Sequence, residues 1–167
     1  MTSIEPAAAP QRIAKITLDE HTVVRRSAAI EDERRAAITD LLEDNRFTPL
    51  SGRAGPFHLH LAVEENRLVM QIRGDGDGPG DGASETIVLP LAPFRRIVKD
   101  YFLVCESYYK AIRAKSFAQV EAIDVGRRSL HDEGSRQLID SLADKVAIDH
   151  DTARRLFTLI CVLHLRA

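Results

Sequence analysis

The chain has 167 residues, which suits one domain with its own core and is short for two. Hydrophobic residues make up 44% and charged residues 29%, ordinary values for a water-soluble globular protein that exclude a wholly disordered chain. The formal net charge of −2 is unevenly spread: residues 1–92 carry 10 Lys and Arg against 15 Asp and Glu, whereas residues 93–167 carry 13 against 10. The basic excess of the second half permits an anionic partner there.

Three features of the sequence favour the cytoplasm. The two cysteines, Cys105 and Cys161, are isolated in apolar stretches and form neither a disulfide framework nor a four-cysteine metal site, which favours a reducing compartment. Residues 1–10 lack the basic start and apolar run of a signal peptide. The longest apolar run, residues 156–163 interrupted only by Thr158, is far shorter than the roughly 18 residues of a membrane span. We expect a cytoplasmic protein that does not enter membranes.

The N-terminal third predicts a tail, a strand and a helix. Residues 1–11 are rich in Ala and Pro and are expected to form a flexible tail. Apolar residues then alternate with polar ones from Arg12 to Leu18, which predicts a strand. From Ser27 the apolar spacing becomes helical, and the acidic residues 31–33 suit the first turn of a helix that fades near Asn45.

The middle of the chain predicts a hairpin and one further strand. Residues 57–64 alternate as a half-buried strand does, a short polar turn follows, and residues 68–72 return. The Gly- and Asp-rich stretch 74–84 cannot pack and is expected to be a disordered loop. Residues 85–91 supply another strand. These strands predict a small antiparallel sheet of about four strands, with the first strand at an edge or between others.

The remaining residues predict helices. Pro93 suits a helix start, and an apolar stripe continues from it to Ile112. Ser116 opens a capping-box pattern, and the helix that follows weakens at Gly126. A separate helix is expected over residues 129–144.

The last predicted helix begins after Asp149, which can cap it. From Leu156 it is apolar almost all round, which predicts the central helix of the core. Strands followed by helices indicate an α+β domain, in which a sheet from the N-terminal half packs against a C-terminal helical bundle. We expect one domain over residues 12–167.

Four segments form a recognisable set: ITLDE (16–20), PFRRIVKDYFLVCESYYKAIR (93–113), QVEAIDVGRRSLHDEGS (119–135) and DTARRLFTLICVLHLR (151–166). They resemble the uncharacterised protein family numbered 0262, which is found in alphaproteobacteria. The likeness covers most of the chain. The Gly/Asp loop and the His-Leu-His sequence at residues 58–60 of the second strand are not part of the family's pattern. The resemblance implies a bacterial cytoplasmic protein and assigns no activity.

Metal and cofactor motifs are weak. His58 and His60 share one face of a strand and can bind a transition metal only if a third ligand arrives from elsewhere; ordinary polar residues on a solvated face explain them as well. A calcium loop starting at Asp75 fails, because Pro79 stands at the fifth position, which needs a carboxylate or amide, and Thr86 at the twelfth, which needs a glutamate. We therefore expect no bound metal and no cofactor.

The densest polar stretch is GRRSLHDEG at residues 126–134. Two arginines and exposed amides near a helix start are suited to an anion or phosphate, and a histidine beside acids can act as a general base. Ordinary helix capping and surface ion pairs fit the same residues, and adjacent helical positions do not form a His–Asp dyad. The candidate anion- or partner-binding residues are Arg127, Arg128, His131 and Glu133.

Residues 142–156 have the rhythm of a helix-turn-helix, whose second helix would offer His150, Arg154 and Arg155 to DNA. Two aspartates at that start would repel phosphate, and the apolar residues after Leu156 leave no open face. An ordinary helical hairpin explains the pattern as well.

Three classes of function therefore stay open. No nucleophile–base pair or phosphate loop stands out, which favours a non-enzymatic accessory or regulatory protein that binds a macromolecular partner, expected to be a protein, through its C-terminal helical face. A small enzyme or anionic-ligand binder would use residues 126–134. A DNA-binding protein would use residues 142–156. The sequence names no substrate and no oligomeric state.

Overall fold

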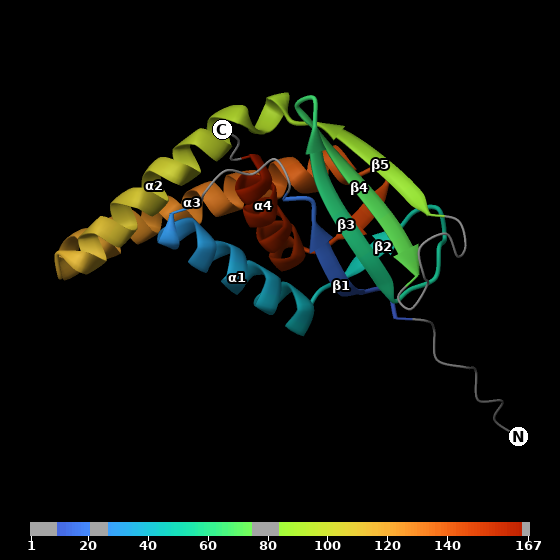
Figure 1. Ribbon diagram of the computed structural model, residues 1–167, viewed down its shortest axis with the longest axis horizontal. Helices are drawn as coiled ribbons and strands as arrows, with labels where there is room; N and C mark the ends of the chain where they lie inside the picture. Colours follow the sequence, from blue (N-terminus) through green and yellow to red (C-terminus); the bar gives the residue numbers. More distant parts are fainter. Residues whose placement is uncertain (1–9, 21–26, 75–83, 165–167) are drawn as a thin grey trace, which may run out of the picture.

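The computed structural model describes residues 10–20, 27–74 and 84–164. Two regions lie side by side, a four-stranded sheet and a group of helices (Figure 1). In chain order the elements are β1 (Ile13–Leu18), α1 (Ala28–Glu43), β2 (Phe47–Pro49), β3 (Phe57–Glu64), β4 (Arg67–Gly74), β5 (Glu85–Pro90), the 3₁₀ turn η1 (Ala92–Phe94), α2 (Arg95–Arg113), α3 (Phe117–Leu142), β6 (Val146–Ile148) and α4 (His150–His164).

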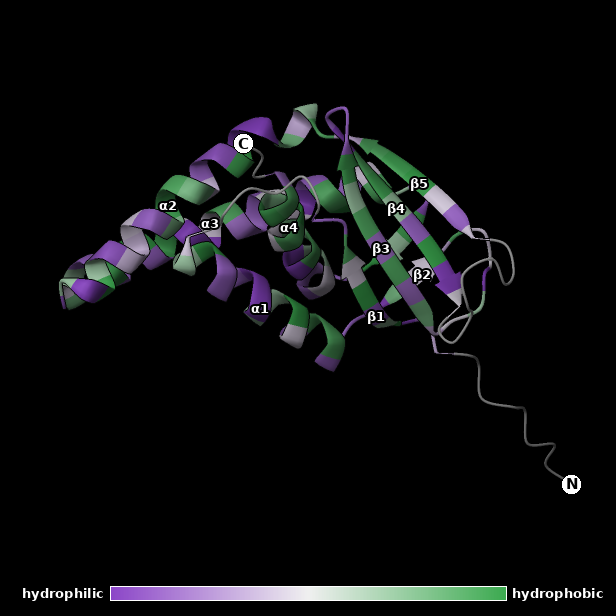
Figure 2. Cartoon of the chain, viewed as in Figure 1, coloured by the Kyte–Doolittle hydropathy of each residue, from purple (hydrophilic) through white to green (hydrophobic). Residues whose placement is uncertain are grey.

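The sheet has the strand order β1-β3-β4-β5, with β1 at one edge. The hairpin β3–β4 turns through Glu65 and Asn66, both with positive φ, which is the geometry of a tight two-residue turn. Apolar and polar residues alternate along the strands, so one face enters the core (Figure 2). The predicted α+β class is confirmed, with one correction: β1 pairs parallel to β3, so the sheet is mixed.

The parallel pairing of β1 follows from the chain's path. Helix α1 carries the chain from the end of β1 back to the start of β3, and a strand–helix–strand unit brings its two strands side by side and parallel. Asn45, which is buried after α1, fixes this arrangement. Its side-chain oxygen accepts the Ile13 amide at 2.7 Å, and its side-chain nitrogen donates to the Ile13 and Leu41 carbonyls.

Helix α4 is the centre of the helical region, as predicted. Its residues from Leu156 to Leu163 are all buried, and it packs against α1 and α3 and touches β3. The Asp149 side chain accepts the Thr152 amide at 3.1 Å, so the predicted cap is also present. Hydrophobic burial on all sides of α4 organises the other helices around it.

The expected break at Gly126 is wrong, because α3 is one continuous helix of 26 residues. A single glycine costs a helix only about 1 kcal/mol relative to alanine, and packing along the rest of the helix outweighs that cost. Ser116 is the N-cap residue of α3, but its side chain makes no capping hydrogen bond.

The segment 142–156 is not a helix-turn-helix. Residues 146–148 form β6, which pairs antiparallel with β2 and adds a two-stranded ribbon between α3 and α4. Most of the expected 74–84 loop and nearly all of the expected N-terminal tail lie outside the described residues. Among the helices of the described chain, none is long and apolar enough to cross a membrane.

Candidate functional site

A polar pocket of about 340 Å³ opens between α1, α3 and α4. Four arginines line it, together with one histidine and two acidic residues. We call it the arginine pocket. Its lining residues are Glu33, Ala36, Ala37 and Asp40 from α1, Arg127, Arg128 and His131 from α3, and Arg154, Arg155 and Thr158 from α4.

Arg127 is the fixed part of this pocket. Its guanidinium bonds the Glu33 carboxylate at 2.9 Å and the Asp124 carboxylate at 2.8 Å, and it lies 4.3 Å from the centroid of the Tyr108 ring. Burial by itself lowers the pKa of Arg127, but the hydrogen bonds that Arg127 donates to Asp124 and the charge of Glu33 outweigh this effect and raise the pKa, so the guanidinium stays charged. With all its partners in place, Arg127 holds the pocket together.

Glu33 joins α1 to α2 and α3. One carboxylate oxygen accepts from Arg127, and the other accepts from the Tyr101 hydroxyl at 3.1 Å. The side chain of Glu33 is only 11% exposed. Burial and nearby Cys105 and Glu33 raise the pKa of Tyr101 well above its usual value, which keeps the hydroxyl protonated as a donor.

His131 lies on the same side of α3, one turn after Arg127. Its ring packs against Tyr101 and Phe157, with centroids 5.2 and 6.5 Å away. Burial, followed by the charges of Arg127 and Arg154, lowers the pKa of His131 to about 4. The imidazole is therefore neutral near pH 7. Its Nε2 atom is buried and has no hydrogen-bond partner among the described residues.

The other three arginines are less constrained. Arg128 pairs with Asp124 at 2.9 Å, but its side chain is 76% exposed. Arg154 reaches Asp151 only at 3.9 Å. Arg155 donates to the Asp44 backbone carbonyl at 2.8 Å, and its buried Nε has no partner among the described residues. These guanidiniums can therefore donate hydrogen bonds to a bound anion without breaking a close buried ion pair.

The structure brings together three of the four residues predicted in the 126–134 stretch. Glu133 is not among them, because it lies on another face of α3 and pairs with Arg96 of α2. Of the residues expected to contact DNA, Arg154 and Arg155 line the same pocket, whereas His150 pairs with Asp132 at 3.5 Å outside it. Two candidate sets that are separate in sequence thus form one site.

The two histidines of β3 lie far from this pocket in the fold, on the sheet. The Thr17 hydroxyl of β1 bonds both rings, at 3.0 Å to His58 Nε2 and 2.6 Å to His60 Nδ1. A single hydroxyl can do so by donating to one ring and accepting from the other. Within the described ranges, no three His, Cys, Asp or Glu side chains gather closely enough to hold a metal ion.

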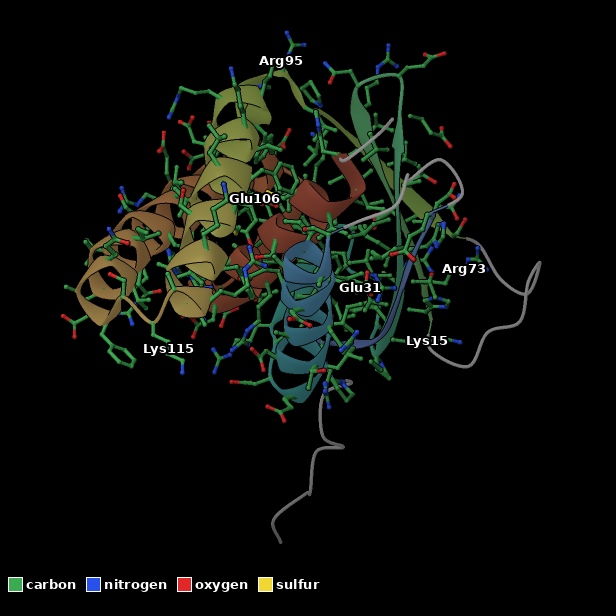
Figure 3. All side chains as sticks on the ribbon, turned by 60° about the vertical axis from the view of Figure 1, so that its left-hand side comes forward. Lys15, Glu31, Arg73, Arg95, Glu106 and Lys115 are labelled. Atoms are coloured by element: carbon green, nitrogen blue, oxygen red, sulfur yellow. The ribbon has the colours of Figure 1, made fainter. Side chains whose placement is uncertain are left out.

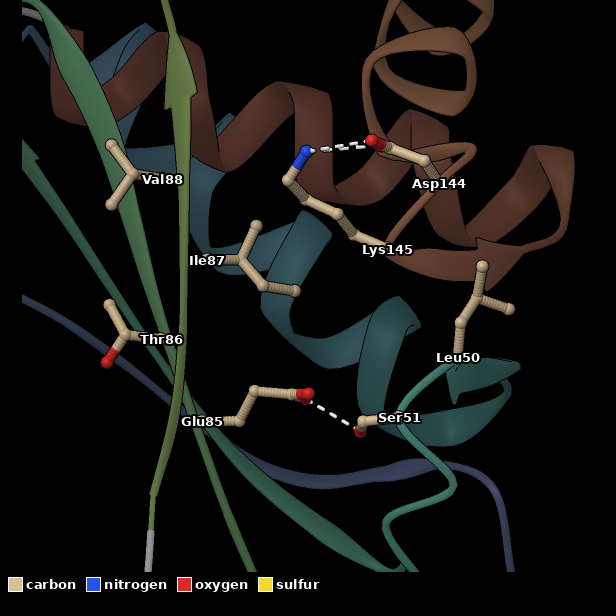
Figure 4. A pocket seen from close by; sticks show the side chains of 8 residues that line it. All are labelled: Leu50, Ser51, Glu85, Thr86, Ile87, Val88, Asp144 and Lys145. Atoms are coloured by element: carbon tan, nitrogen blue, oxygen red, sulfur yellow. Dashed lines mark hydrogen bonds and ion pairs between the residues drawn. The ribbon is translucent and has the colours of Figure 1, made fainter.

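A second pocket, of about 420 Å³, lies between the edge strand β5 and the β2–β6 ribbon. Figure 4 shows Ile87 and Glu85 pointing from β5 toward it, opposite Leu50 and Lys145. Its charged groups already have partners: Lys145 bonds Asp144 and Glu85 accepts from Ser51 at 3.1 Å. This pocket therefore offers a ligand few charged groups that lack a partner.

Sequence reasoning missed the contribution of α1. From the sequence, Glu33 is predicted to be a first-turn acid that favours the helix dipole, and Asp40 belongs to no motif. Both lie on the face that packs toward α3 and α4. Helical spacing does give a signal, since positions 33, 36, 37 and 40 share one side of a helix. The two residues in the middle of that side are alanines, however, and small residues do not predict a face that packs against other helices.

Comparison with known proteins gives a family. The family model described as "Uncharacterised protein family (UPF0262)" matches residues 10–166. A UPF0262 protein of Azorhizobium caulinodans is 54% identical over 159 residues, which cover 93% of this chain and 94% of that protein. One of Rhodospirillum rubrum is 58% identical over 151 residues, which cover 90% and 91%. No solved structure matches. The predicted family is confirmed, and the chain belongs to UPF0262.

Proposed function

We propose that this protein binds a small anionic molecule in the arginine pocket. The observation that carries the proposal is the position of unsatisfied polar atoms. Three buried side-chain atoms of the described chain lack a hydrogen-bond partner, and two of them, His131 Nε2 and Arg155 Nε, belong to residues of this pocket. A buried polar atom without a partner costs about 1–3 kcal/mol, so it calls for a partner such as a ligand or a bound water.

The charges support the same class of ligand. Arg127 is neutralised by Glu33 and Asp124, whereas Arg154 and Arg155 have no close carboxylate partner within the described ranges. Arginine forks bind carboxylates and phosphates in bidentate fashion, and partial burial strengthens such bonds. The volume of about 340 Å³ lies at the lower end of the range for small-molecule sites.

The chemistry of the pocket favours binding over catalysis. With a pKa of about 4, His131 is a weak general base at neutral pH, because a base works best with a pKa near the operating pH. Burial raises the pKa of the neighbouring Cys105 to about 12, which keeps the thiol protonated and unreactive. The proposal is therefore a ligand-binding protein without a reaction of its own.

The test is calorimetric titration of the full chain with inorganic phosphate, pyrophosphate and citrate at low ionic strength. We expect at least one anion to bind, and Arg155→Gln to weaken it by about tenfold or more, the loss of one charge-assisted contact. Arg95→Gln is the matched control. It removes the same charge, and Arg95 points out of the fold at the start of α2, away from the pocket (Figure 3).

Two results would count against anion binding. One is the absence of heat and of thermal stabilisation with all three anions. The other is an equal loss of affinity in Arg155→Gln and Arg95→Gln, which would indicate a general charge effect in place of a site.

A second candidate function is the binding of a protein partner through α2 and α3, whose hairpin extends past α1 (Figure 1). One observation favours it: Phe117 is 80% exposed, Val125 69% and Leu103 60%. Exposed apolar side chains mark a contact surface when they form one continuous patch, so this role requires the three residues to act together. Phe117→Ser should release such a partner in a pull-down without lowering the melting temperature, and retention of every partner would argue against this role.

DNA binding through residues 142–156 gains no comparable support. Helix α4 is buried from Thr152 onward, apart from Arg154, Arg155 and its end, so it offers no open face to a groove. The two arginines expected to contact DNA instead line a pocket far too small for a duplex.

A further inference from the structure

The arginine pocket contains one acidic residue, Asp40, that does not pair with the arginines around it, whereas its other acidic residue, Glu33, pairs with Arg127. Asp40 lines it from α1 and forms no ion pair with any described residue, although four arginines line the same pocket. Among the described residues, Arg155 faces the pocket from α4 and bonds only a backbone carbonyl, and Arg154 has only Asp151, at 3.9 Å. Asp40 is an exposed residue, and its carboxylate lies beyond ion-pair distance of every described arginine of the pocket.

The geometry of α1 explains the separation. Glu33 and Asp40 lie on the same side of the helix, with Ala36 and Ala37 between them. The two alanines leave space where longer side chains would close the gap. Glu33 is already committed to Tyr101 and Arg127, so Asp40 is the carboxylate left available on this wall.

We propose that the ligand of this pocket is a small zwitterion. Its anionic group lies against Arg154 and Arg155 of α4, and its ammonium group pairs with Asp40 of α1. This inference rests on the proposed anion binding and adds the second charge. The charge of Asp40 weakens the binding of a purely anionic ligand, whereas an ammonium group a few bonds from the anionic group turns the same carboxylate into a favourable contact.

The experiment compares ligands that differ only in the ammonium group. Calorimetric titrations of the full chain use O-phosphoethanolamine against ethyl phosphate, and β-alanine against propionate, so that the two pairs also tell a phosphate from a carboxylate. We expect the ammonium-bearing member of at least one pair to bind about fivefold more tightly or better, the contribution of one partly shielded ion pair.

Asp40→Asn locates the effect. In this variant we expect the preference for the ammonium-bearing ligand to vanish, while the simple anion binds as well as before or better, because a nearby negative charge is gone. Glu43→Gln is the control, since it removes the same charge from an exposed position of α1 outside the pocket, and it should keep the preference.

The outcomes separate this inference from the proposed function. If ethyl phosphate or propionate binds but the ammonium-bearing partner binds no more tightly, the zwitterion is wrong and anion binding stands. A preference that survives in Asp40→Asn also overturns the inference. If no compound binds and inorganic phosphate, pyrophosphate and citrate also fail, both proposals are wrong.

Discussion

The molecule contains two clusters of polar side chains with histidines, and they differ in how completely their hydrogen bonds are satisfied. On the sheet, the Thr17 hydroxyl bonds one ring nitrogen of His58 and one of His60, and no buried side-chain atom of these described residues lacks a partner. Between the helices, Glu33, Tyr101 and Arg127 form an equally complete network, but His131 and Arg155 beside it each keep a buried atom without a partner. The first arrangement stabilises a sheet edge, whereas the second combines a rigid support with groups free to bind.

The largest expected effect concerns the support. Glu33→Ala removes the carboxylate that serves Tyr101 and Arg127, and leaves a guanidinium that is only 22% exposed with Asp124 as its remaining acid. We expect a loss of about 3 kcal/mol in the free energy of unfolding, measured in urea. Asp32→Ala, at an exposed neighbouring position, should change it by less than about 0.5 kcal/mol. Similar losses in both variants would contradict the network.

The next effect concerns pH. The pKa of His131 is about 4 in the folded protein against 6.5 for the free side chain, so between these values the unfolded chain binds more protons. Stability should therefore fall as the pH drops from about 6.5 toward 4, by about 2 kcal/mol from this residue after allowance for its partial exposure. His131→Gln should flatten that part of the stability profile. An unchanged slope would show that His131 titrates normally.

Substitutions of two glycines in α3 should change the free energy of unfolding in opposite directions, because one glycine is tightly packed and the other is not. A Cβ at Gly134 would lie 2.5 Å from the ring of Phe157, which is fully buried, so Gly134→Ala should destabilise the fold by about 1.5 kcal/mol. A Cβ at Gly126 meets nothing within 4 Å, so Gly126→Ala should stabilise it by about 0.5–1 kcal/mol. Urea unfolding of both variants checks these opposite signs. The same sign in both would mean that α3 does not pack as described.

The smallest effect concerns the sheet cluster. Thr17→Val keeps the shape of the side chain and removes the hydroxyl that bonds the two histidines, which should cost about 1 kcal/mol in urea unfolding. Anion binding in the arginine pocket should not change. A change in anion affinity would show that the two clusters are coupled.

Much of the fold could be predicted from the sequence because its signals are local. Alternation along residues 57–64, the spacing from Ser27 onward and the cap at Asp149 each depend on neighbours within one element, and each prediction is confirmed. The expected break at Gly126 was wrong for the same reason, since local propensity favoured an end that packing overrides.

Only the tertiary structure decided which helices pack against one another and which side chains meet. The sequence by itself determined the family, the class and which arginines and histidines were candidates. It did not determine that Arg127 and Arg155, from different candidate sets, line one pocket, or that Glu33 of α1 completes it. Those relations depend on how α1 and α3 pack around the buried helix α4, and no pattern within a single helix records which helix will face it.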